Sequence, residues 1–173
     1  MTKVKTQVLE KINIRSIVWF VGLMTVVAVV PHYVHNQFIT GPIVNAVLFI
    51  AVMTVGAGNA ILIGLVPSVV ALVSGLLPAP LAPMVPFIMI SNAILILVFS
   101  YIRKINYWGG VIGATLFKYV FLYLTSTIVV GLISNHNIGL KAAATMMAWP
   151  QIVTALAGGV IAFGIIKFIH YKE

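Results

Sequence analysis

The sequence predicts an all-α integral membrane protein with six transmembrane helices in a single bundle. The chain of 173 residues is 62% hydrophobic and only 7% charged, with a mean hydropathy of +1.17. It therefore lacks the polar residues that cover a water-soluble domain. Its apolar residues form continuous runs close to the roughly 20 residues that a helix needs to cross a bilayer. A β-barrel would require alternating segments of about ten residues, which this sequence does not show convincingly.

The expected helices follow from these runs and from the breaks between them. The first run ends at Pro31, the Gly-Ala-Gly-Asn turn at 56–59 reverses the chain, and the prolines between 78 and 83 form a rigid connection. Pro150 divides the last segment into a short amphipathic piece and a full span. We expect one domain, 1–173, with helices at about 15–31, 39–55, 60–77, 85–102, 108–133 and 151–168, and an amphipathic segment at 140–148.

The cations, which give a net charge of +8, predict the orientation. With six spans, one side of the membrane receives nearly all of the loop lysines and arginines, and the other receives only Lys141. By the positive-inside rule the first side is cytoplasmic, so both termini are expected in the cytoplasm of a prokaryotic cell. The cations are too scattered to form a nucleic-acid-binding face. The basic start could also belong to a signal peptide, but a small-x-small cleavage site is missing. The cytoplasmic-side cations are Lys3, Lys5, Lys11, Arg15, Arg103, Lys104, Lys167 and Lys172.

The acidic residues and cysteines exclude much chemistry. Glu10 and Glu173 are the only carboxylates, and there is no cysteine. Proton relays, sodium sites and carboxylate metal centres within the membrane all need buried carboxylates, and thiol chemistry needs cysteine. We therefore expect a non-enzymatic protein and no cofactor.

Lys118 is the leading candidate for a functional residue. It lies about ten residues, or roughly 15 Å, from the cytoplasmic end of its helix, too deep to reach water easily. An intramembrane charge costs about 3 kcal/mol or more, so it needs a partner such as an anionic ligand. The alternative is a lysine that reaches a water-filled groove or stays neutral. Thr125, seven residues further on, is expected on the same helix face.

Other polar groups in the apolar segments are further candidates. Asn45 and Asn92 each place an amide inside a helix, where it lines a pocket or joins helices through a hydrogen bond. Trp149 and Gln151, on either side of Pro150, offer a flat apolar ring and an amide. For Trp149, an interfacial anchor is the common alternative.

Polar loop residues are also expected on the outer face. His35, Asn36 and His136 are included as candidate ligand contacts. The i, i+3 spacing of His32 and His35 is too common to predict a metal site, although nitrogen ligands suit several metals. Two pairs of small residues are suited equally to packing within the bundle and to docking a partner. These pairs are Ala155 with Gly159 and Gly158 with Ala162.

Six spans, short proline-marked outer loops and the run from Leu81 to Ala93, LAPMVPFIMISNA, resemble the substrate-binding S components of energy-coupling factor transporters. The resemblance covers nearly the whole chain. It implies an outward pocket for a vitamin, a precursor or a metal ion, built from the later helices and the outer loops. It also implies as partners a membrane scaffold, the T component, and two ATP-binding-cassette ATPases.

The sequence departs from this family in two places. Several members carry an alanine-xxx-alanine pattern on the first helix, which the segment 21–28 lacks. Members for nickel or cobalt place a histidine close to the initiating methionine, whereas the first histidine here is His32. The second difference disfavours a metal substrate.

The function predicted first is a subunit that captures a small anionic or carboxylate-bearing, vitamin-like molecule. Lys118 would supply the counter-charge, and Asn92, Gln151 and Trp149 would orient the molecule. A scaffold protein of similar architecture ranks second, because it needs no pocket. A small channel ranks third, since the polar residues lie mainly in the outer half, and an intramembrane enzyme ranks last.

Overall fold

The computed structural model describes residues 14–133 and 149–171, and all secondary-structure elements within these residues are helices. Six of its helices are long and apolar enough to cross a membrane, which confirms the predicted all-helical architecture. They are α1 (Ile14–Tyr33), α2 (Gln37–Thr54), α3 (Gly56–Val73), α4 (Val85–Ile102), α5 (Tyr107–Ile133) and α7 (Trp149–Tyr171), and a short 3-10 helix, η1 (Ala79–Met84), precedes α4.

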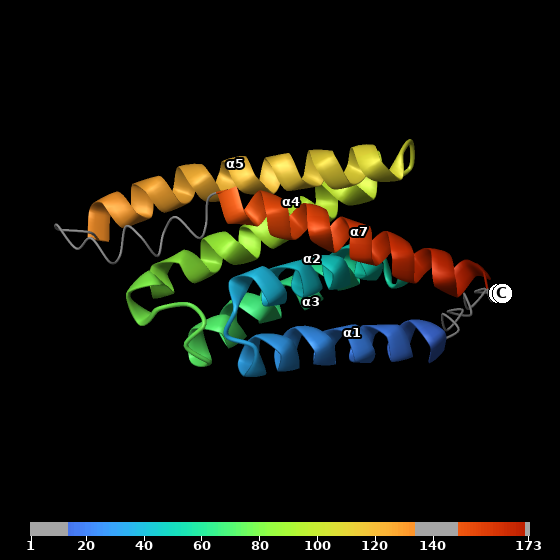
Figure 1. Cartoon of the computed structure of the whole chain (residues 1–173), viewed down its shortest axis with the longest axis horizontal. Helices are drawn as coiled ribbons and strands as arrows, with labels where there is room; N and C mark the ends of the chain where they lie inside the picture. The colour runs from blue at the N-terminus through green and yellow to red at the C-terminus, as the bar shows by residue number, and fades with distance from the viewer. Residues whose placement is uncertain (1–13, 134–148, 172–173) are drawn as a thin grey trace, which may run out of the picture.

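The helices run along the long axis of the molecule, with α1 at one edge and α5 at the opposite edge (Figure 1). Helix α2 lies between them and packs against α1, α3, α4 and α7, and α5 packs against α4 and α7. An apolar helix that is surrounded by other helices is buried on all sides. Most of α2 is accordingly buried, and it forms the centre of the bundle.

Local backbone chemistry sets the connections at one end of the bundle. Asn36 caps α2, because its side-chain oxygen accepts the N–H of Phe38 at 2.9 Å. Helix α3 ends at Val73, four residues before the expected end at Leu77. Gly75 follows with a φ of +81°, a left-handed conformation that glycine adopts without steric cost and that turns the chain out of the helix.

The connection between α2 and α3 is shorter than the sequence suggests. The expected turn at 56–59 is instead the first turn of α3, and Val55 is the only residue between the two helices. Gly56, with a φ of +83°, makes this tight reversal possible. Helix α1 continues through Pro31 to Tyr33, since the φ of proline is itself helical. The amphipathic segment expected at 140–148 lies outside the described residues.

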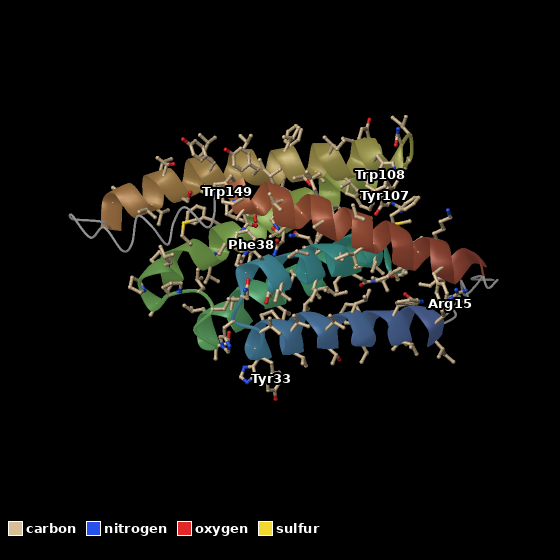
Figure 2. The ribbon with its side chains drawn as sticks, viewed as in Figure 1. Arg15, Tyr33, Phe38, Tyr107, Trp108 and Trp149 are labelled. Atoms are coloured by element: carbon tan, nitrogen blue, oxygen red, sulfur yellow. The ribbon has the colours of Figure 1, made fainter. Side chains whose placement is uncertain are left out.

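Positive charge marks one end of the bundle, where α1 begins and α7 ends, and aromatic side chains join helices there (Figure 2). Four of the five described lysines and arginines belong to this end: Arg15, Arg103, Lys104 and Lys167. Tyr107 packs edge-on against Phe99 with ring centroids 5.5 Å apart, and its hydroxyl donates to the Gly159 carbonyl at 2.8 Å. These contacts join α4, α5 and α7 at that end.

Candidate functional site

Lys118 is the one described lysine or arginine in the interior of the bundle, and only 4% of it is exposed. Its Nζ donates to the Oδ1 atoms of Asn45 at 2.8 Å and Asn92 at 2.9 Å. The described ranges contain no carboxylate, because the only two acidic residues are Glu10 and Glu173. The partners of Lys118 in the described structure are therefore neutral amides from two other helices, α2 and α4.

Both amides are held by backbone groups. The Nδ2 of Asn45 donates to Gly41 O one turn earlier on α2, at 2.9 Å, and the Nδ2 of Asn92 donates to Gly64 O on α3, at 2.8 Å. Each amide N–H2 thus faces a carbonyl and each amide oxygen faces Lys118, so a flipped amide would place donors against donors. The arrangement fixes the Lys118 amine between α2 and α4.

A cavity of about 110 Å³ adjoins this cluster. One water needs only roughly 10–15 Å³, so the cavity has room for a small ligand or for several waters. It extends from Lys118 to the connections that follow α1 and α3, at the end away from the four other cations. Its lining comprises Pro31, Gln37, Thr40, Gly41, Val44, Asn45, Pro67, Ser68, Ala71, Leu76, Leu77, Pro78, Leu81, Ile88, Asn92, Lys118, Leu122 and Gln151.

The chemistry of the cluster favours an acceptor as ligand. A lysine ammonium has three N–H donors and no acceptor, and the described structure assigns two of these donors to Asn45 and Asn92. A third donor remains for a group in the cavity. An anionic oxygen suits it best, because hydrogen bonds between two charged groups are the strong ones.

Gln151 lines the cavity, whereas Trp149 does not. The Trp149 side chain is 59% exposed and packs against Phe38 of α2, with ring centroids 6.0 Å apart (Figure 2). Residues two positions apart on a helix point in different directions. Of these two predicted ligand contacts, therefore, only Gln151 is placed to meet a molecule in the cavity.

Thr125 is also outside the cavity. Its hydroxyl donates to Phe121 O at 2.8 Å within its own helix. Beyond Lys118 the buried positions of α5 follow a spacing of four residues, at Leu122, Ser126 and Val130. Because four residues exceed one helical turn, the buried face rotates along the helix and leaves Thr125 half-exposed.

The predicted loop residues support the connections and do not line the cavity. The Nε2 of His35 lies 2.9 Å from Ser74 O, which links the connection after α1 to the end of α3. Asn36 is the N-cap of α2. His136 lies outside the described residues. Within those residues, no three His, Asp or Glu side chains converge on a point where a metal could bind.

Three polar residues of the cavity are not among the candidates predicted from the sequence: Gln37, Thr40 and Ser68. A usable signal was present for the first two. Gln37 and Thr40 are three residues apart, and Gln37 precedes Asn45 by eight residues, about two turns, so each lies near the helix face of Gln37. No sequence pattern indicates Ser68, because whether its side chain faces the cavity depends on how α3 packs against the other helices.

The small residues of α7 pack within the bundle. Ala155 and Ala162 are fully buried, and a side chain added at Gly158 would lie 2.7 Å from the Cβ of Asn45. Small residues allow two helix backbones to approach closely. Here they bring α7 against α2 at the level of the Lys118 cluster.

Comparisons with protein-family models, with curated proteins and with solved structures found no match to this chain. Its function is therefore inferred from the chemistry of the Lys118 cluster and the adjoining cavity.

Proposed function

We propose that this chain is a membrane-embedded binding subunit that captures a small anionic or carboxylate-bearing molecule. Lys118 is the counter-charge, Asn45 and Asn92 hold its amine, and Gln151 lines the cavity. The observation that carries the proposal is a buried lysine, without a carboxylate partner in the described structure, that borders a cavity.

Electrostatics support a charged ligand. A cation within the membrane costs about 3 kcal/mol or more, and two amide oxygens satisfy donors without cancelling the charge. An anion in the cavity would supply both the missing charge and an acceptor for the remaining donor. The apolar walls of the cavity would strengthen that attraction, since water is largely excluded.

The resemblance to S components of energy-coupling factor transporters suggests the biological setting. The run from Leu81 to Ala93 that carries the resemblance includes three residues that line the cavity: Leu81, Ile88 and Asn92. In this setting the chain lies in the cytoplasmic membrane of a prokaryote and binds a vitamin-like molecule from outside. A T component and two ATP-binding-cassette ATPases drive its release inside.

The charge distribution supports the orientation that this role needs. The described cations other than Lys118 belong to the end where α1 begins and α7 ends. By the positive-inside rule that end is cytoplasmic. The cavity, at the opposite end, then faces the exterior.

One observation favours a second function, that of a scaffold protein. The Lys118 cluster connects α2, α4 and α5 through two hydrogen bonds, and interhelical hydrogen bonds of this kind stabilise membrane bundles. In a scaffold the cluster would hold the bundle together, and the cavity would contain only water.

The deciding experiment is native mass spectrometry of the detergent-purified chain, followed by analysis of small molecules in the denatured extract. A stoichiometric metabolite that is lost in Lys118→Met and retained in Lys104→Met would support the binding function. Lys104 is a suitable control because it is exposed at the opposite end. An empty protein that gains no thermal stability from a panel of vitamins and precursors would favour the scaffold.

A further inference from the structure

We infer that the cavity selects a singly charged carboxylate that enters with its carboxylate end leading and carries a hydrogen-bond donor about six bonds from its carboxyl carbon. Thr40 and Ser68 recognise this donor. The inference rests on the proposed binding function and adds to it the number of charges, the orientation and two residues that determine specificity.

The number of charges follows from the inner end of the cavity. Among the described residues, Lys118 is the only cation that lines it. The amide N–H2 groups of Asn45 and Asn92 already donate to Gly41 O and Gly64 O. Each of these amides therefore has one N–H donor fewer for an anion. The single positive charge of Lys118 can neutralise one carboxylate. A phosphate dianion or a dicarboxylate would keep one uncompensated negative charge in an apolar cavity.

The position of the donor follows from Thr40 and Ser68. Both side chains line the cavity and are at least 97% buried. The Thr40 hydroxyl donates to Val34 O at 2.7 Å, and the Ser68 hydroxyl donates to Leu65 O at 3.1 Å. Because each hydroxyl hydrogen is used in this way, the oxygen remains as an acceptor. These oxygens therefore suit a ligand O–H or N–H and disfavour a second carboxylate.

Helix geometry gives the distance between the two ends of the ligand. Thr40 is five residues before Asn45 on α2, and Ser68 is four residues after Gly64 on α3, which is the carbonyl that holds Asn92. At 1.5 Å per residue, Thr40 and Ser68 lie about 6–8 Å along the helix axes from the residues that hold the Lys118 cluster. Both lie towards the end of the bundle that carries the connections after α1 and α3. An extended chain covers that distance in about six bonds.

The test uses four matched probes with the full chain in lipid nanodiscs: hexanoate, 6-hydroxyhexanoate, hexanamide and adipate. We expect 6-hydroxyhexanoate to bind roughly three- to tenfold more tightly than hexanoate, which is the effect of one neutral hydrogen bond. Hexanamide lacks the charge and adipate carries a second one, so both should bind at least tenfold more weakly than 6-hydroxyhexanoate.

Three variants make the test specific. Thr40→Val and Ser68→Ala should reduce the advantage of 6-hydroxyhexanoate over hexanoate, while Lys118→Met should weaken both acids at least tenfold. Because the readout is a ratio of two ligands on the same variant, partial loss of stability does not imitate the effect.

The inference is overturned if hexanamide binds as tightly as hexanoate, if the hydroxyl confers no advantage, or if no probe binds. The proposed binding function is judged separately by the metabolite in the purified protein. A stoichiometric metabolite without a carboxylate, or with two, would support binding and contradict this inference. A protein without any bound metabolite, unresponsive to the vitamin panel, would count against both.

Discussion

Gly158 of α7 lies directly against Asn45 of α2. A Cβ built on Gly158 would stand 2.7 Å from the Asn45 Cβ, 2.8 Å from the backbone nitrogen of Ala46 and 2.9 Å from the Pro42 carbonyl oxygen. Two of these neighbours are backbone atoms, which cannot move aside as a side chain does. The absence of a side chain at Gly158 therefore allows α7 to approach the helix that positions one of the two partners of Lys118.

Gly158→Ala should consequently separate α7 from α2 and destabilise the protein by about 1–3 kcal/mol, the usual cost of overpacking a close contact. Thermal unfolding in detergent measures the change. Gly164→Ala on the same helix is the matched control, because no atom lies within 4 Å of its built Cβ. Equal unfolding temperatures for the two variants would contradict the close packing.

Asn92→Asp should abolish ligand capture while the protein remains folded. The new carboxylate would lie within hydrogen-bonding distance of the Lys118 Nζ and would neutralise it internally, so an incoming anion would lose its counter-charge. Native mass spectrometry of the purified variant should show occupancy reduced at least tenfold. Asn59→Asp serves as the control, since Asn59 is exposed and its Nδ2 donates to the Val55 carbonyl, four residues earlier in the chain. Full occupancy in Asn92→Asp would refute the counter-charge role.

Gly75→Ala should weaken the end of α3. The φ of +81° at Gly75 is a left-handed conformation that costs a residue with a Cβ about 1–2 kcal/mol. The segment that follows contributes Leu76, Leu77 and Pro78 to the cavity, so ligand affinity should fall together with the unfolding temperature. Gly131→Ala, within α5 and without close neighbours, should alter neither. An unchanged unfolding temperature in Gly75→Ala would show that this conformation is not needed.

The proposed orientation can be tested by cysteine labelling, because the chain contains no natural cysteine. Tyr33 and Ile105 are 74% and 87% exposed and lie at opposite ends of the bundle. We expect Tyr33→Cys to react with a membrane-impermeant maleimide on intact cells, and Ile105→Cys to react only after lysis, because the cations lie at the Ile105 end. The reverse pattern would invert the topology and place the cavity on the cytoplasmic side.

Hydropathy alone predicts the six spans, because a bilayer requires long apolar helices and little else in the chain competes with that signal. The ends of the helices are harder to predict. Gly56 and Gly75 both adopt left-handed conformations, but the first allows a reversal with one intervening residue and the second ends a helix. The sequence shows a glycine in each case, and only packing decides which geometry it takes.

The inner end of the site was predictable for a physical reason. Lys118, Asn45 and Asn92 are polar groups in apolar segments, and a buried polar group must find a partner. These three side chains are expected to meet, because the apolar segments offer few other polar side chains as partners. The outer part of the site depends on helix rotation instead, which explains why Trp149 and Thr125 point away while Thr40 and Ser68 line the cavity.

The position of Lys118 in the chain also affects how the protein enters the bilayer. Its acceptors, Asn45 and Asn92, belong to helices that are synthesised before α5. When the ribosome delivers α5 to the insertion machinery, the two amides are already available to receive the amine. We therefore expect insertion of the span that carries the charge to depend on earlier helices, because a chain without both asparagines would present an unassisted cation to the translocon.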